Sequence, residues 1–187
     1  MVPPFIITEI AYPTETIYGL GAKYDDENAL KKLYTLKQRP LEKTFPIIIG
    51  SVEQLSLMAE DVNNAAADLI TRFWPGPLTL IFHAKSGLNN YICWNGKVAV
   101  RIPGASFALD LVGAALFPIT ATSANISGLP PARTAKMIAD YFTDNLDLII
   151  DGGDSPMVVP STLVDVTENT PLILREGAIN TARLFIR

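Results

Sequence analysis

Three cations, Lys37, Arg39 and Lys43, lie within one stretch of seven residues. Lysine holds a phosphate as a compact charge, whereas the planar guanidinium of arginine can hold two of its oxygens at once. Cations in the last turn of a helix also offset the helix dipole, but this effect does not account for Lys43, which follows Pro40. We therefore interpret the three cations as a site for a polyphosphate.

Two further segments are rich in small residues that carry hydroxyl groups. Residues 13–21 hold two threonines and two glycines after a predicted strand, and residues 120–128 hold four hydroxyls and the amide of Asn125. The second segment has more polar groups than capping and turn formation would use, so it suits an anionic or polar ligand. The first segment is equally compatible with an ordinary turn, and it lacks the third glycine of the dinucleotide-binding fingerprint.

Arg101 stands alone among apolar neighbours. Alternation along residues 98–102 places its side chain on the face opposite Val98 and Val100. A buried arginine without a partner would cost several kcal/mol, so solvent, an acidic residue or an anionic ligand such as a carboxylate must hold it. Ser161 and Arg175 form a fourth candidate pair, and their separation of fourteen residues suits two adjacent strands. We expect the three arginines 39, 101 and 175 to meet at one cavity.

Two residue types limit the chemistry because each occurs only once. The chain has one histidine, His83, and one cysteine, Cys93. These numbers exclude a multi-histidine metal centre and an internal disulfide framework, and they disfavour a Ser-His-Asp or Cys-His nucleophile. Positioning and electrostatic stabilisation would then carry the catalysis, as in phosphoryl and nucleotidyl transfer.

Alternating helix and strand patterns must position these groups. The predicted strands are residues 5–10, 45–49, 78–84, 97–102, 118–122, 148–151, 162–166 and 172–175. The predicted helices are residues 26–39, 51–58, 61–73, 107–116 and 134–142, with a last turn from Asn180. Asp25 or Asp26, Ser51, Ser106 and Thr134 are the expected helix caps. Interleaved helices and strands, with neighbouring strands in the middle and at the end, predict one α/β (α+β) domain over residues 1–187, built on a mixed sheet.

The composition of the chain sets the broad class. Its 187 residues are 49% hydrophobic and 18% charged, with a formal net charge of -4. No apolar run reaches the roughly 18 residues of a membrane span, and no signal-peptide pattern begins the chain. We expect a cytoplasmic protein with no membrane association and no stable nucleic-acid binding.

Seven segments of the chain, taken in order, resemble the YrdC family of threonylcarbamoyl-AMP synthases. They are residues 13–21, 37–40, 74–79, 98–103, 122–128, 161–165 and 175–177. The resemblance implies a twisted open mixed sheet flanked by helices, with a concave groove. It also implies an enzyme that condenses L-threonine, bicarbonate and ATP into threonylcarbamoyl-adenylate and releases pyrophosphate, with Mg²⁺ accompanying ATP. The product would pass to downstream tRNA threonylcarbamoyl transferase proteins.

The resemblance also assigns roles to the residues of these segments. Lys37, Arg39 and Arg101 would be catalytic. The ATP-binding residues would be Lys37, Arg39, Lys43, Ser123, Asn125 and Arg175. The residues that hold L-threonine would be Thr16, Arg101, Ala121 and Ser161. The chain departs from the family at Ile48, Lys97 and Pro131, where relatives often carry His, Thr and Ser.

Two other functions are compatible with these motifs. One is an enzyme domain that handles carbamoyl-adenylate, as in hydrogenase-maturation carbamoyltransferases, which usually carry acylphosphatase and zinc modules as well. The other is a non-catalytic RNA-binding module that uses the basic groove. The acidic net charge and the scarcity of clustered aromatic residues disfavour the second alternative.

Overall fold

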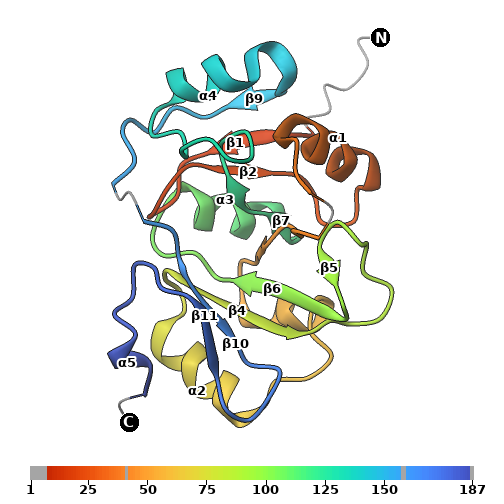
Figure 1. Ribbon diagram of the computed structural model, residues 1–187, viewed down its shortest axis with the longest axis vertical. Coiled ribbons are helices and arrows are strands. Elements are labelled where there is room, and N and C mark those ends of the chain that lie inside the picture. The colour runs from red at the N-terminus through yellow and green to blue at the C-terminus, as the bar shows by residue number, and fades with distance from the viewer. Residues whose placement is uncertain (1–7, 41, 157–158, 186–187) are drawn as a thin grey trace.

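The computed structural model describes residues 8–40, 42–156 and 159–185. Its strands form two mixed sheets flanked by helices (Figure 1), which confirms the predicted α/β class. The division into two sheets was not predicted. Figure 1 shows the first sheet in the half of the molecule that also holds α1 and α4, and most of the second sheet in the half that holds α2.

The first sheet has four strands in the order β8-β2-β1-β9. Their bounds are β1 Ile10–Tyr12, β2 Gly19–Gly21, β8 Thr122–Ser123 and β9 Leu148–Ile149. β1 pairs antiparallel with β2 and parallel with β9. The predicted strand 5–10 is therefore displaced, and residues 5–7 lie outside the described residues. The backbone N–H groups of Thr8 and Glu9 donate to the carboxylate of Asp147 instead of joining a strand ladder.

The second sheet has seven strands, six of them in the order β11-β10-β4-β6-β3-β7, while β5 pairs with β6. Their bounds are β3 Ile47–Ile48, β4 Leu78–His83, β5 Cys93–Trp94, β6 Lys97–Arg101, β7 Ile119–Thr120, β10 Thr162–Asp165 and β11 Leu172–Arg175. Leu80, Val100 and Val164 are buried and lie side by side on β4, β6 and β10. They share one apolar core with residues of α2, so alternate side chains of these strands point to the opposite face.

The predicted strand 118–122 is two strands that belong to different sheets. β7 pairs with β3 in the second sheet, whereas β8 pairs with β2 in the first. Ala121 lies between them, at the point where the chain passes from one sheet to the other. The sequence pattern of one extended segment does not reveal such a crossing. The sheet that each half joins depends on its partner strand, which lies far away in the sequence.

The helices follow the predicted order, with small shifts at their ends. They are α1 Glu27–Lys37, α2 Asn64–Phe73, α3 Phe107–Ala115, α4 Ala135–Phe142 and α5 Ala182–Phe185, with 3-10 helices at Val52–Leu57 and Thr143–Asn145. Asp26 and Thr134 cap α1 and α4 as predicted, each accepting a backbone N–H with its side chain. α1 ends two residues before Arg39 because Gln38 adopts a left-handed conformation with φ 48°.

Two predicted caps occupy the expected positions without making the capping bond, and one predicted helix start is wrong. Ser51 makes no side-chain capping bond; the N–H of Gly50 donates to the side chain of Gln54 instead. Ser106 makes none either, since its hydroxyl donates to the carbonyl of Gly104. α2 begins at Asn64 rather than Asp61, and Asn63 caps it. In the described part of the chain, no helix has the length and apolar character needed to span a membrane.

Candidate active site

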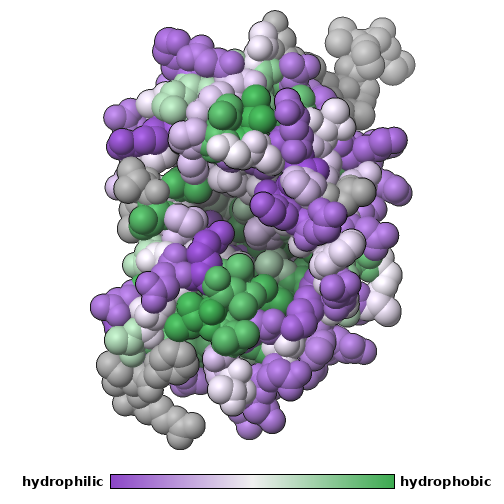
Figure 2. Space-filling view, viewed as in Figure 1, coloured by the Kyte–Doolittle hydropathy of each residue, from purple (hydrophilic) through white to green (hydrophobic). Residues whose placement is uncertain are grey.

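A cavity of about 210 Å³ lies where the two sheets meet. The first sheet contributes Gly19 and Ser123, and the second contributes Thr79, Arg101 and Arg175. Figure 2 shows the surface hollowed between the two halves of the molecule, and a hydrophobic patch beside this hollow over β10, β11 and the neighbouring strands. The cavity therefore receives side chains that the sequence separates widely.

The cavity brings together most of the predicted site residues. Seven of them line it, and they are Thr16, Arg39, Arg101, Ala121, Ser123, Ser161 and Arg175. The predicted meeting of the three arginines at one cavity is confirmed. Lys37, Lys43 and Asn125 do not line it, and their neighbours explain why.

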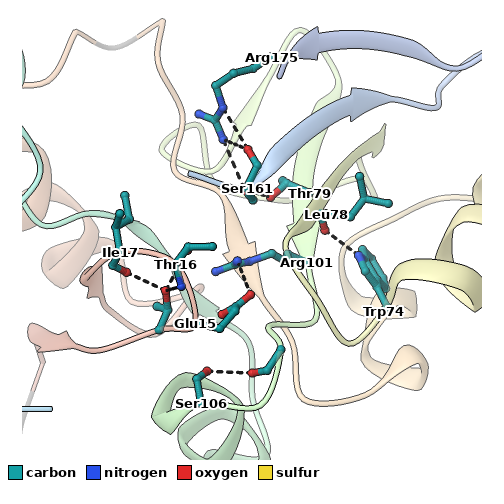
Figure 3. A network of polar contacts seen from close by, with 12 residues as sticks. Glu15, Thr16, Ile17, Trp74, Leu78, Thr79, Arg101, Ser106, Ser161 and Arg175 are labelled. Atoms are coloured by element: carbon teal, nitrogen blue, oxygen red, sulfur yellow. Dashed lines mark hydrogen bonds and ion pairs between the residues drawn. The ribbon is translucent and has the colours of Figure 1, made fainter. Parts of the chain in front are cut away.

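Arg101 is the most deeply buried of the three arginines. Its Nη1 donates to Oε1 of Glu15 at 2.8 Å, so an acidic partner holds this lone cation (Figure 3). Burial lowers the pKa of Arg101, and the charge of Glu15 opposes that shift. An arginine stays protonated in proteins, so Arg101 presents a permanent positive charge to the cavity.

Ser161 and Arg175 lie at the end of the cavity near β10 and β11. The guanidinium of Arg175 donates to the carbonyl oxygen of Ser161 from Nη2 at 2.8 Å and from Nε at 3.2 Å. The hydroxyls of Ser161 and Thr79 lie 2.7 Å apart (Figure 3). The predicted adjacency of Ser161 and Arg175 is therefore confirmed.

Thr79 is a cavity residue that the sequence analysis missed. It lies on β4 between Leu78 and Leu80, which are both buried, so alternation directs it to the opposite face of the sheet. The indole of Trp74 donates to the carbonyl of Leu78 at 2.7 Å, which holds the start of β4. Strand alternation was the signal that could have found Thr79.

The loop between β1 and β2 presents both of its threonines to the cavity, and one of them also shapes the turn. The hydroxyl of Thr14 donates to the carbonyl of Ile17 at 2.7 Å and accepts the backbone N–H of Thr16 at 3.0 Å. The two hydroxyl oxygens lie 3.0 Å apart. Thr14 thus holds the turn that places the buried Thr16 against the cavity, and Thr14 lines the cavity as well.

Lys37 is buried beside the cavity rather than in it. Its side chain is 1% exposed, and Nζ donates to the carbonyls of Ser123 and Asn125 and, at 3.2 Å, to Oδ1 of Asn125. Burial, and to a lesser degree the charge of Arg39, lowers the pKa of Lys37 to about 7. Its ammonium ties the end of α1 to the loop after β8, and its predicted contact with phosphate stays a prediction.

Asn125 is used inside the same loop. Its Oδ1 accepts from the hydroxyl of Ser123 at 2.6 Å, and its Nδ2 donates to the carbonyl of Leu129 at 2.6 Å. The sequence analysis interpreted the many polar groups of this segment as ligand contacts. Some of them instead bond to one another and to the backbone of the loop. Ser123 still lines the cavity, whereas Asn125 holds the loop that carries it.

Arg39 is held in place by the backbone that follows it. Its Nη2 donates to the carbonyl of Thr44 at 2.9 Å and its Nε donates to the carbonyl of Lys43. The guanidinium also lies over the ring of Phe45, 5.3 Å from its centroid. The side chain of Lys43 is exposed and outside the cavity, so only its backbone contributes here.

Comparison with known proteins places this geometry in a family. The profile of the Sua5/YciO/YrdC family, described as "Telomere recombination", matches residues 8–177. The chain belongs to this family. The family match spans every cavity-lining residue described above, including the three arginines.

Curated relatives in the Sua5/YciO/YrdC family carry one name. The chain is 44% identical to the threonylcarbamoyl-AMP synthase of Pyrococcus abyssi over 172 residues, which are 91% of the chain and 50% of that protein. It is 37% identical to the threonylcarbamoyl-AMP synthase of Vibrio parahaemolyticus over 171 residues, 90% of the chain and 91% of that protein. The chain thus spans about half the length of the Pyrococcus relative.

A solved structure of the same family agrees in fold. The crystal structure of Pyrococcus abyssi Sua5 complexed with L-threonine superposes with a TM-score of 0.90 at 40% identity. The match covers 95% of this chain and 54% of that one.

The departures from the family pattern fall into two groups. Ile48 and Pro131 line the cavity, where both side chains are apolar. Lys97 does not line it; its Nζ on β6 donates to Oδ2 of Asp165 at 2.7 Å on β10, across the intervening β4. The first two departures therefore bear on ligand binding, and the third on the sheet.

Proposed function

We propose that the chain synthesises L-threonylcarbamoyl-adenylate from ATP, L-threonine and bicarbonate, with release of pyrophosphate. This reaction is the first step in forming threonylcarbamoyladenosine in tRNA. The observation that carries the proposal is the meeting of Arg39, Arg101 and Arg175 at one cavity, in a family whose relatives are named for this reaction. A triphosphate and a carboxylate both need such charges.

The reaction would proceed by positioning and electrostatic stabilisation, without a nucleophile from the protein. Among the described residues that line the cavity there is no histidine, cysteine, lysine or carboxylate. The substrates would therefore react with each other: the amine of threonine attacks the carbon of CO₂ and releases a proton, or attacks bicarbonate and releases water, and either route forms a carbamate. A carbamate oxygen then attacks the α-phosphorus, and the bond to the leaving pyrophosphate breaks. Holding these groups in line can supply much of the rate enhancement.

The three arginines would divide two tasks. Arg101 would pair with the carboxylate of threonine, because it is the most deeply buried of the three and one of its nitrogens is already fixed. Arg39 and Arg175 would hold the phosphates and offset charge that develops on the leaving group. The hydroxyls of Thr16 and Ser161 lie along the wall that would bind threonine.

Magnesium would arrive with ATP as part of the substrate. The described lining residues offer hydroxyl oxygens but no carboxylate, and Mg²⁺ in nucleotide sites is held largely by phosphates and water. We assign no step of the reaction to a protein-bound metal. The adenylate would pass to the tRNA threonylcarbamoyl transferase proteins in the cytoplasm.

Pyrophosphate release tests the proposal. We expect ATP to yield pyrophosphate and an adenylate only when L-threonine and bicarbonate are both present. Turnover with carbamoyl phosphate in place of both would indicate a carbamoyl-adenylate enzyme instead. Affinity for RNA without turnover would indicate a binding module. L-serine is the matched control substrate, because it keeps the carboxylate and hydroxyl but lacks the methyl group.

A further inference from the structure

Glu15 contacts the guanidinium of Arg101 but is not one of the residues that line the cavity. The two side chains are 16% and 8% exposed, so solvent screens their ion pair only weakly. The other carboxylate oxygen of Glu15, Oε2, is buried and has no hydrogen-bond partner within the part of the chain that the structure describes. This arrangement costs stability, since a buried charge is best stabilised when all its oxygens are bonded.

The fold makes room for this carboxylate. A Cβ atom added at Gly104 would lie 3.1 Å from Cγ of Glu15 and 3.5 Å from its Cδ. Gly104 follows the end of β6, which presents Arg101, whereas Glu15 lies in the loop between β1 and β2. The ion pair therefore joins an element of the first sheet to an element of the second (Figure 3).

Because the guanidinium of Arg101 is planar, its contact with Glu15 fixes the orientation of the whole group. Its nitrogens form a rigid fork, so a hydrogen bond that fixes Nη1 also fixes the direction of the others. Figure 3 shows Arg101 between Glu15 and Thr16 on one side and Ser161 with Arg175 on the other. Within the described residues the guanidinium makes no other hydrogen bond, so its remaining N–H groups are available to a ligand in the cavity that Arg101 lines.

We propose that Glu15 is a positioning residue that orients Arg101 for the carboxylate of the amino-acid substrate. The inference rests on the proposed function for the identity of that substrate, but not for the orientation itself. Glu15 acts through Arg101, because it does not line the cavity. It explains why a buried carboxylate with one unbonded oxygen is present beside an anion-binding residue.

Substrate binding separates this role from a purely structural one. We expect Glu15→Ala to weaken L-threonine binding by about tenfold or more in calorimetry, while ATP binding stays within about twofold. Glu15→Gln should recover most of the lost affinity, because its carboxamide oxygen can still accept from Nη1. Glu168→Ala, at an exposed glutamate, is the matched control. Equal losses for threonine and ATP would overturn the proposal.

A lysine background provides a second comparison. An ammonium is a point charge without a planar fork, so it needs no fixed orientation. In the Arg101→Lys protein, Glu15→Ala should therefore change threonine affinity by less than about threefold. A full tenfold effect in this background would show that Glu15 acts independently of Arg101.

Nuclear magnetic resonance of the arginine side chains tests the orientation without any substrate. We expect the Nη resonances of Arg101 to be separate, owing to slow rotation, in the original protein and in Glu15→Gln. They should average in Glu15→Ala, with circular dichroism showing that this variant is folded. Unchanged resonances in Glu15→Ala would refute the proposal. Failure to bind L-threonine together with the expected resonances would refute the proposed function alone.

Discussion

At the scale of single residues, the site contains four cationic side chains, and the hydrogen-bond partners of each one determine its position. Arg39 and Arg175 are bonded to backbone carbonyls and remain at the cavity, whereas the ammonium of Lys37 is surrounded by three acceptors. Among these four cations, and within the part of the chain that the structure describes, only Arg101 has an acidic partner, which is Glu15. The acceptors around each cation thus decide whether it stays at the cavity or ties two segments of the fold together.

Replacing Arg101 should separate the two substrates. Arg101→Ala removes the cation assigned to the threonine carboxylate, so threonine binding should fall by at least about tenfold, since a charged hydrogen bond contributes roughly 1.5–3 kcal/mol. ATP binding should change far less. Calorimetry with each substrate measures both effects.

The Arg101→Ala variant needs a control for stability, because Glu15 is largely buried. Arg101→Ala leaves this carboxylate without its partner, which should lower the free energy of unfolding by about 3–5 kcal/mol. Arg101→Lys keeps a cation and serves as the milder variant. Equal losses of both substrates in the milder variant would mean that Arg101 does not hold threonine.

At the scale of elements, polar side chains hold short strands that make few backbone hydrogen bonds to their neighbours. β9 has only two residues and pairs with β1. Just before it, Asp147 accepts from the backbone and hydroxyl of Thr8 and from the backbone of Glu9, and Lys32 of α1 lies 3.6 Å from its other oxygen. One carboxylate thus anchors the edge of the first sheet.

The pKa of Asp147 makes this anchor measurable. Desolvation raises it, but the hydrogen bonds from Thr8 and Glu9 and the charge of Lys32 outweigh that effect and lower the pKa to about 2. Because the folded pKa lies below the unfolded value of about 3.9, the stabilisation is present above pH 4 and is lost as the pH falls towards 2.

We therefore expect Asp147→Asn to lower the free energy of unfolding at pH 7 by about 1–2 kcal/mol, with the difference from the original protein shrinking below pH 4. Urea denaturation at several pH values measures this. Asp140→Asn, at an exposed carboxylate paired with Lys136, should cost less than about 0.5 kcal/mol. A difference that stays constant from pH 7 to pH 2 would contradict the assignment.

At the scale of the whole molecule, the cavity exists because two sheets meet. The chain passes from one sheet to the other between β7 and β8, and the Glu15–Arg101 pair joins them again close by. A ligand that contacts Thr16 on one side and Arg101 on the other would add a third link. Binding and the stability of the whole fold should therefore be coupled.

Thermal unfolding tests this coupling. A ligand present at 100 times its Kd stabilises the folded state by about 2.7 kcal/mol, and each kcal/mol shifts the Tm of a chain this size by roughly 2–4 °C. We expect L-threonine or ATP with magnesium each to raise Tm by about 5–10 °C under these conditions. Arg101→Lys should reduce the shift with threonine but keep the shift with ATP. The same reduction for both would argue against separate subsites.

Local patterns determined much of this protein. Alternation and capping residues predicted most helices and strands, and the charges near Pro40 together with Arg101 and Arg175 predicted an anion-binding cavity, because such signals depend on residues a few positions apart. The tertiary structure decided which sheet each strand joins, and it paired Arg101 with Glu15 and Lys37 with Ser123, each 86 positions away. Contacts over such distances depend on how the whole chain packs, so no short segment encodes them.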